Sequence, residues 1–179
     1  MSSLTKDPLL SIAKIVLVVF LGAIGVAGVA LTAALIGLPF YSGLLLEKLA
    51  EQNSPVGSQL IWALAGIFIL AIVLVAIAFY FFALLRRIVN SVGDGDPFIA
   101  ENATRLTHMA WASLAGQLTA IPLTAVATYI GKIASDAGKH VNYDISFPID
   151  GLLMVLILFI LARVFRKGTE MREELEGTV

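Results

Sequence analysis

The chain has 179 residues, of which 59% are hydrophobic and only 14% charged, and its net charge at neutral pH is -1. This composition lies far outside the globular average and indicates an integral membrane protein. The near-neutral charge excludes the strongly basic profile of a direct nucleic-acid binder, and the absence of cysteine excludes disulfides, iron–sulfur clusters and thiol catalysis.

The first apolar run, residues 15–38, carries no charge, and only Thr32 in it is clearly polar. A helix needs about 20 apolar residues to cross a hydrocarbon core of about 30 Å. The run is too long for a cleaved signal peptide, and no small-x-small cleavage site precedes a soluble domain. We therefore expect a first span, preceded by a short cytoplasmic lead-in at residues 1–11.

Two connections are predicted on the outer side. Residues 39–59 contain YSGLLLEKLAEQ, in which leucines and charged residues fall on opposite faces of a helix. This pattern predicts a short amphipathic helix on the outer surface, although a first span that continues past a kink at Pro39 is equally compatible. The second connection, residues 132–149, alternates at Val141, Tyr143, Ile145 and Phe147, which suits a strand or an extended cover over the bundle.

Three later runs complete the pattern. Residues 60–85 and 109–130 are uncharged and long enough to cross, whereas the uncharged run at 151–162 is too short and must borrow residues on both sides. Asp150 and Arg163 would then lie near the two interfaces. The predicted spans of this single all-α membrane domain are about 12–38, 60–85, 107–130 and 148–165.

The basic residues predict the orientation. In a four-span layout, nine of the 12 Lys and Arg residues fall on the side that holds both ends of the chain. Because basic residues stay in the cytoplasm, we predict a four-transmembrane-helix bundle with N and C termini cytoplasmic. The loop at 86–106 and the tail at 166–179 then face the cytoplasm. Lipid phosphates are the expected ligands of Arg86, Arg87, Arg166 and Lys167.

The stretch GDGDPFIAENATRL, residues 93–106, is the polar, irregular part of this apolar chain. Gly93 and Gly95 provide backbone freedom just after the second span. Asp96 followed by Pro97 suits a helix N-cap followed by proline at the first helical position. Glu101 would lie in the early turns, where the helix dipole favours an acid.

The longer stretch NSVGDGDPFIAENATRLTHMAW, between the second and third of four spans, resembles the signature of the bacterial membrane family called domain of unknown function 2975. The matching residues are Gly95, Pro97, Phe98, Glu101, Asn102, Arg105 and Leu106. Where the family commonly has Ser or Thr after Pro-Phe, this chain has Ile99, which moves the expected helix cap back to Asp96. Length and layout are also similar. The resemblance implies location in the bacterial cytoplasmic (inner) membrane, no established activity, and a small helix-turn-helix regulator as a partner.

The third span carries polar residues on one face. At 100° per residue, these residues fall within about 60° of one another, and lipid penalises such a stripe. The stripe either makes interhelical hydrogen bonds or lines a ligand or ion path. Its members are Ser113, Gln117, Thr124 and Thr128. Small residues such as Gly22, Gly25 and Gly28 let the first span approach a neighbouring helix, within the chain or in a homo-oligomer.

Candidate catalytic and metal sites are weak. Asp94, Asp96 and Glu101 offer too few oxygen ligands at fixed positions for a calcium loop. The layout places His108 and His140 on opposite sides of the membrane, so they cannot form one site. The sequence contains no nucleophile elbow and no His-Glu-x-x-His motif. We expect no enzyme activity, no cofactor and no metal.

Two functional hypotheses follow. In the first, the protein is a regulatory or sensory bundle that presents its cytoplasmic loop and tail to a soluble transcriptional regulator. The residues expected at that interface are Asp96, Pro97, Phe98, Glu101, Asn102 and Arg105. In the second, the protein is a small transporter or ligand-binding bundle that uses the polar stripe, or a structural subunit of a homo-oligomer.

Overall fold

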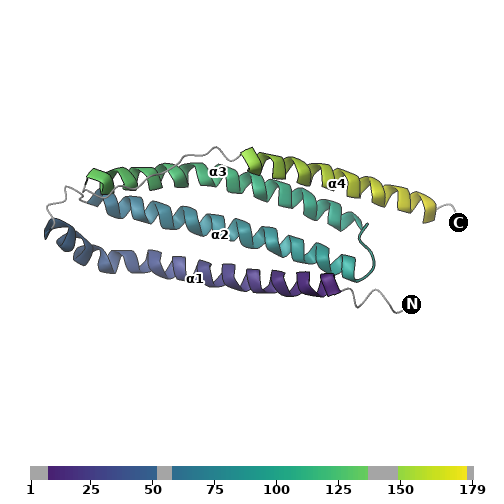
Figure 1. Ribbon diagram of the computed structural model, residues 1–179, viewed down its shortest axis with the longest axis horizontal. Coiled ribbons are helices and arrows are strands. Elements are labelled where there is room, and N and C mark those ends of the chain that lie inside the picture. The colour runs from purple at the N-terminus through teal and green to yellow at the C-terminus, as the bar shows by residue number, and fades with distance from the viewer. Residues whose placement is uncertain (1–7, 52–57, 137–148, 177–179) are drawn as a thin grey trace. The chain divides into compact units, whose positions relative to one another are not determined.

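The computed structural model describes residues 8–51, 58–136 and 149–176, and all its regular elements there are helices (Figure 1). In chain order, these are α1 (Pro8–Glu51), α2 (Ser58–Gly93), α3 (Ala100–Asp136) and α4 (Ile149–Glu176). The prediction of an all-helical chain is confirmed for the described residues. Each helix is longer than the apolar run that predicted it, so the helices continue into the flanking polar sequence.

Three of the helices contain segments long and apolar enough to cross a membrane: Pro8–Leu44, Gln59–Gly93 and Ala100–Lys132. The prediction of a membrane protein is therefore confirmed. α4 differs because its uncharged stretch, residues 151–162, covers only about 18 Å at 1.5 Å per residue. Within α4, Asp150 and Arg163 lie about 20 Å apart along the axis, so they cannot both lie at the interfaces of a core of about 30 Å.

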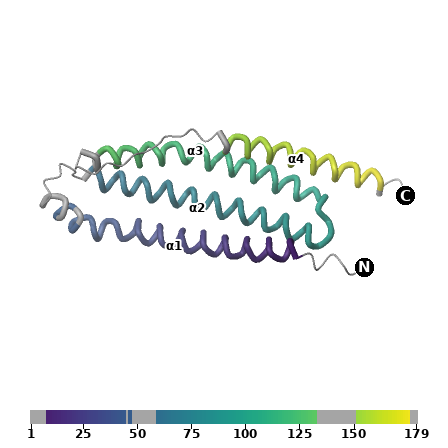
Figure 2. The backbone as a smooth tube through the Cα atoms, in the orientation of Figure 1, coloured from purple at the N-terminus to yellow at the C-terminus, as the bar shows by residue number. Residues whose placement is uncertain are grey.

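The separate outer-surface helix predicted after the first span is wrong. α1 continues without interruption through Pro39, as the alternative of an extended first helix allowed (Figure 2). A proline removes one backbone hydrogen bond, but apolar helices tolerate this loss where neighbouring groups bond again. The carbonyl that Pro39 leaves without a donor is that of Leu35; the Ser42 hydroxyl donates to a different one, the carbonyl oxygen of Pro39, at 2.7 Å. The strand or cover predicted at Val141–Phe147 lies outside the described residues.

The residues of the chain group into two compact units, each held by contacts within itself. Unit 1 contains residues 1–25, 77–116 and 148–179, and unit 2 contains residues 26–76 and 117–147. The buried core of unit 1 comes from α2, α3 and α4, at the three- and four-residue spacing of one helical face. Its residues are Leu84, Ile88, Leu106, Met109, Ala110, Leu158 and Ala162. α1 joins this unit through Phe20, whose ring centroid lies 5.5 Å from that of Phe82.

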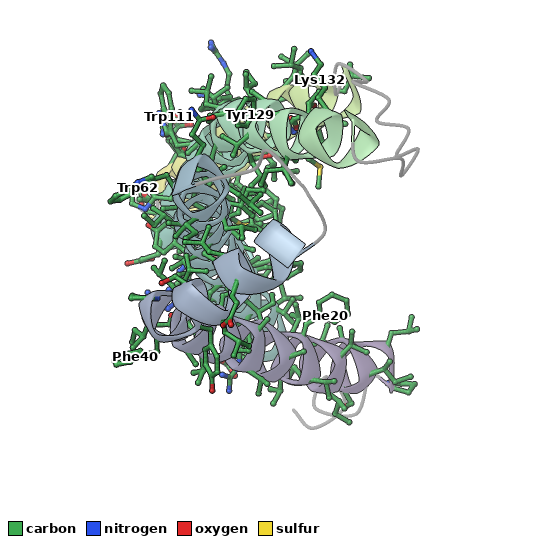
Figure 3. All side chains as sticks on the ribbon, turned by 90° about the vertical axis from the view of Figure 1, so that its left-hand side faces the viewer. Phe20, Phe40, Trp62, Trp111, Tyr129 and Lys132 are labelled. Carbon is green, nitrogen blue, oxygen red and sulfur yellow. The ribbon has the colours of Figure 1, made fainter. Side chains whose placement is uncertain are left out.

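In unit 2, large aromatic side chains lie on the outside of the helices (Figure 3). Trp62 is 77% exposed, and Phe40 and Tyr129 are also exposed. Trp62 and Arg86 are 24 positions apart along α2, which corresponds to about 36 Å. Arg105 and Tyr129 on α3 are separated by the same 24 positions. A basic residue at one end and an aromatic residue at the other, at this spacing, fit the two interfaces of a bilayer.

Candidate functional site

The turn between α2 and α3 is held by its own backbone. The amides of Asp94, Gly95 and Asp96 donate to carbonyl oxygens in the last turn of α2, at Asn90, Val92 and Ser91, over 3.0 to 3.2 Å. These bonds satisfy carbonyls that a helix end would otherwise leave unpaired. Gly95 has a φ of 91°, which side-chain-bearing residues rarely adopt. The predicted role of Gly95 in the turn is confirmed.

Gly93 has a different role from Gly95. A Cβ atom at this position would lie 2.7 Å from Nζ of Lys14 and 2.9 Å from Cδ2 of Leu10. Both neighbours come from the first turns of α1. The absence of a side chain at Gly93 therefore lets the start of α1 pack closely against the end of α2.

Asn102 is the most enclosed polar residue of the turn, with an exposed fraction of 0%. Its Nδ2 donates to the hydroxyl oxygen of Ser91 at 2.7 Å and to the carbonyl oxygen of Pro97 at 2.9 Å. Its Oδ1 accepts a bond of 2.8 Å from Nη1 of Arg105. One amide side chain thus connects the end of α2, the irregular segment and the first turns of α3. Because buried polar groups are costly unless bonded, this arrangement stabilises one conformation of the turn.

The predicted N-cap at Asp96 is wrong, because α3 begins at Ala100 and residues 96–99 are not helical. The amide of Asn102 donates to the carbonyl oxygen of Ile99 at 3.0 Å, so the chain first turns into the helix at Ile99. The carboxylate of Asp96 is instead paired with another helix. The acid expected in the early turns is present, because Glu101 lies in the first turn of α3 and is exposed.

The end of α4 lies against this turn. The carboxylate of Asp96 accepts a hydrogen bond from Nη1 of Arg172, 76 residues away in the sequence. The Phe98 ring packs against Phe165, with centroids 5.3 Å apart. A Cβ at position 168 would lie only 2.8 Å from the Phe98 ring, so Gly168 provides the space that the ring occupies. The turn and α4 are therefore joined by one ion pair and one ring packed on a glycine.

The sequence matches the family described as protein of unknown function (DUF2975) over residues 44–179, which is 136 of the 179 residues. The chain belongs to this family. The match includes the whole turn and α4 but begins near the end of α1, so most of α1 lies outside it. No curated protein and no solved structure matches the chain.

Not all residues expected at the interface of this DUF2975 protein are accessible. Phe98 is 43% exposed and Glu101 is exposed. Asp96, Pro97 and Arg105 are half-buried, and Asn102 is buried. Phe98 and Glu101 are therefore accessible at the surface, whereas Asn102 acts inside the turn.

Most of the basic residues described in unit 1 lie near one level of their helices, whereas Lys14 and Arg172 lie beyond it, at Gly93 and Asp96. Contacts between α2 and α3 fix this register: the Tyr80 hydroxyl lies 3.2 Å from Nδ1 of His108, and Ser91 bonds Asn102. Between α3 and α4, Trp111 packs on Phe159 at 5.6 Å. By helical rise, the level of Arg86 on α2 then corresponds to Arg105 on α3 and to Phe165 on α4, between Arg163 and Arg166. Four of these basic residues were predicted to bind lipid phosphates, and all four are exposed near this level. They are Arg86, Arg87, Arg166 and Lys167.

The polar stripe of α3 is partly satisfied by its own helix. The hydroxyl of Thr124 donates to the carbonyl of Ala120 at 2.9 Å, and that of Thr128 donates to the carbonyl of Thr124 at 2.8 Å. Ser113 and Gln117 are half-buried, and their side chains make no hydrogen bond with another described residue. The interhelical bonds considered for the stripe are therefore not made by these two threonines.

Several contacts at the turn were not anticipated from the sequence. Nothing local marks Ser91 as the partner of Asn102, or Arg172 as the partner of Asp96. Gly168 does carry a signal, because a glycine inside a charged helix often marks a close approach. His140 and the side chain of Asp150 lie outside the described residues.

Proposed function

We propose that this protein is a multi-pass regulatory or sensory protein of the bacterial inner membrane. It presents the α2–α3 turn and the end of α4 to a soluble partner. The observation that carries this proposal is the exposure of Met171 and Leu175, at 51% and 71%, beyond the basic level of α4. Exposed apolar side chains that lipid does not reach are typical of a protein contact.

Both ends of the described chain are proposed to lie in the cytoplasm. The start of α1 packs at Gly93 and the end of α4 pairs with Asp96, so both lie at the end of unit 1 that holds the turn (Figure 1). The excess of basic residues at this end supports its cytoplasmic location. If α3 crosses the membrane, the chain must cross once more to bring α4 back. α4 covers about 21 Å from Ile149 to Arg163, so a fourth crossing of a core of about 30 Å must be longer than this part of α4.

The absence of cysteine makes this topology straightforward to test. We expect single cysteines introduced by Asp94→Cys and Glu173→Cys to react with a membrane-impermeant maleimide only after the cells are permeabilised. Lys132→Cys, at an exposed position near the other end of α3, should react in intact cells. Labelling of Glu173→Cys in intact cells, with Asp94→Cys protected, would contradict a common side for the turn and α4.

The resemblance to family members suggests a helix-turn-helix regulator as the soluble partner. The test is a pull-down of the tagged full-length protein from its native membrane in mild detergent, with mass spectrometry of the co-purified proteins. We expect a stoichiometric soluble regulator that is lost from a Met171→Ala/Leu175→Ala variant. Substitution of Asn102 is unsuitable here because that residue is buried and its loss would disturb the turn itself.

A matched control exists on the same helix. Leu153 and Ile157 have the same four-residue spacing and similar exposure, 53% and 57%, but lie in the apolar part of α4. A Leu153→Ala/Ile157→Ala variant should retain the partner. Equal retention by both double variants would argue against the proposed surface, and recovery of the protein with lipid alone would argue against the regulatory function.

A transport or ligand-binding function is the second candidate. It is favoured by the half-buried side chains of Ser113 and Gln117, which lack a hydrogen-bond partner among the described residues. If these residues line a path, Gln117→Leu should abolish uptake or ligand binding while the protein stays folded. If Gln117→Leu changes only thermal stability, the polar stripe is structural. Neither proposal assigns a catalytic reaction to the chain.

A further inference from the structure

The water-facing end of unit 1 is acidic. We call this region the cap surface and define it as residues 93–101 of the turn and 168–175 of α4. It contains six acidic residues and one basic residue, Arg172; Lys14 lies beside it at Gly93 and Lys167 pairs with Glu170, so the formal charge with these two lysines is -3. The acidic residues are Asp94, Asp96, Glu101, Glu170, Glu173 and Glu174. The cap surface therefore contrasts with the basic level directly below it.

Apolar side chains are exposed within this acidic region. Val164, Gly168, Met171 and Leu175 follow one face of α4 at spacings of four and three residues. Phe98, which is 43% exposed, packs on this face at Gly168, one turn before Met171. Together, Phe98, Met171 and Leu175 form a short apolar strip with acidic residues around it.

Lipid does not reach the outer end of this strip. Further back along α4, the same face carries Leu153, Ile157 and Ile160, which suit contact with hydrocarbon. Met171 and Leu175 lie five and nine positions beyond Arg166, which corresponds to about 8 and 14 Å along the axis. Because each headgroup layer is only about 5 to 8 Å thick, Leu175 lies in water.

The negative charge of the cap surface distinguishes between two possible occupants of the apolar strip, the membrane surface and a helix of another protein. A helix that binds the membrane surface needs basic residues to attract anionic headgroups, and an acidic one is repelled. A basic amphipathic helix is complementary to both the apolar strip and the acidic residues around it. Its apolar face would contact the strip, and its Lys and Arg residues would face the carboxylates. The membrane surface is therefore disfavoured as the occupant, and a basic partner helix is favoured.

We propose that the cap surface binds a basic amphipathic helix of a soluble protein, with Phe98, Met171 and Leu175 in contact with the apolar face of that helix. This rests on the proposed function and adds the chemistry of the partner. The acidic residues steer the partner and confer salt dependence, and the apolar strip supplies the affinity that survives at high salt.

The test uses the full-length protein in nanodiscs of phosphatidylcholine. The probe is a fluorescein-labelled helical peptide of about 18 residues, with leucines on one face and lysines on the other. Controls are a peptide of the same composition with scrambled leucine positions, a leucine–glutamate peptide and empty nanodiscs. Binding is followed by fluorescence anisotropy at low and high salt.

We expect the leucine–lysine peptide to bind the protein nanodiscs and neither control peptide to do so. Met171→Ala/Leu175→Ala should weaken binding about tenfold or more, because the variant truncates two of the three apolar side chains proposed to contact the partner helix. Glu170→Gln/Glu174→Gln should weaken binding mainly at low salt. Leu153→Ala/Ile157→Ala should bind like wild type because these residues face lipid.

Several results would overturn the inference. These are equal binding to empty nanodiscs, equal binding of the scrambled peptide, or unchanged binding by Met171→Ala/Leu175→Ala. A change of oligomeric state in that variant, measured by cross-linking, would show instead that the cap surface joins two copies of the chain. If the native pull-down yields a regulator while the peptide does not bind, the regulatory function stands and the basic-helix chemistry is wrong. If the peptide binds specifically but no native partner is recovered, the cap surface is a binding site for a basic helix, and the proposed regulatory function is wrong.

Discussion

The two units use different means to hold their helices together. In unit 1, Asn102 bonds three other residues and the Asp96–Arg172 pair joins α4 to the turn. In unit 2, the cross-helix hydrogen bond among described side chains is the one from the Tyr129 hydroxyl to Gln59, at 3.2 Å. There, Gly28 allows close approach, because a Cβ at that position would lie 3.3 Å from Val75.

This difference follows from the surroundings of each unit. Lipid is as apolar as the helix surfaces it covers, so packing within the membrane depends on close approach and van der Waals contact. The turn emerges into water, where backbone groups must be satisfied and competing conformations are accessible. A buried polar side chain with several partners selects one of those conformations. The contrast predicts that replacing a polar residue at the turn lowers the free energy of unfolding more than replacing a polar residue in the apolar helices.

The largest effect is expected for Asn102→Ala. This substitution removes the Asn102 bonds to the Pro97 carbonyl, to Arg105 and to Ser91, which keeps only its bond to the Ile88 carbonyl, and we expect a loss of about 3 kcal/mol of unfolding free energy. The measurement is unfolding in mixed micelles by denaturing detergent. Asn90→Ala is the matched control, because Asn90 is half-buried and its side chain makes no hydrogen bond with a described residue. Equal losses for the two variants would show that the bonds of Asn102 do not stabilise the turn.

A smaller effect is expected at Gly168. Gly168→Ala places a methyl group 2.8 Å from the present position of the Phe98 ring, which must shift and lose part of its packing on Phe165. We expect a loss of about 1 kcal/mol, in the range of moderate overpacking. Gly22→Ala makes the same change in α1, where nothing lies within 4 Å, and should be neutral or slightly stabilising. Comparing the thermal stability of the two variants distinguishes the loss of the Phe98–Gly168 contact from the effect of alanine on helix propensity. If the Gly168→Ala protein is as stable as the Gly22→Ala protein, the contact does not stabilise the fold.

A still smaller effect is expected for the ion pair between Asp96 and Arg172. Both side chains are nearly half exposed, so a double-mutant cycle with Asp96→Asn and Arg172→Gln should give about 0.5 kcal/mol at low salt and less at high salt. The Lys167–Glu170 pair, at 3.1 Å within one turn of α4, provides a reference that joins no separate elements. A coupling energy above 2 kcal/mol would show that the pair holds α4 on the turn more strongly than its exposure suggests.

The smallest effect is expected at Thr124. Its hydroxyl bonds the backbone of α3, so Thr124→Val removes a local bond and leaves the neighbouring helices unchanged. We expect a change within about 0.5 kcal/mol, as for exposed positions away from special features. A loss comparable with that of Asn102→Ala would show that the polar residues of the two units are equally important and would remove the basis of the comparison.

Much of the fold could be predicted because its signals are local. Apolar runs of sufficient length predicted the helices that became α1, α2 and α3, and glycines after the second run predicted the turn at Gly95. Element boundaries were less accurate. The pattern of leucines after Pro39 could not distinguish a separate surface helix from a continued one, since both place the same residues on the same face.

The candidate site was predicted in position but not in detail. The Asp-Pro pair suggested an N-cap at Asp96, yet the bonds of Asn102 hold residues 96–99 in an irregular conformation and delay the start of α3 to Ala100. Phe98 and Asn102 were grouped as surface residues, although one is partly exposed and the other is buried. Burial depends on what packs above a residue, which a local motif does not specify.

By itself, the sequence determined that the protein belongs in a membrane, where its long apolar helices run, and where a polar turn interrupts them. These properties depend on composition and on spacing along one chain segment, which short-range physics controls. Only the tertiary structure decided that Asn102 is enclosed, that Asp96 pairs with Arg172 across 76 positions, and that Phe98 packs on Gly168. Such pairings arise when distant helices dock, because many acids, bases and glycines in the chain are locally equivalent until packing selects among them.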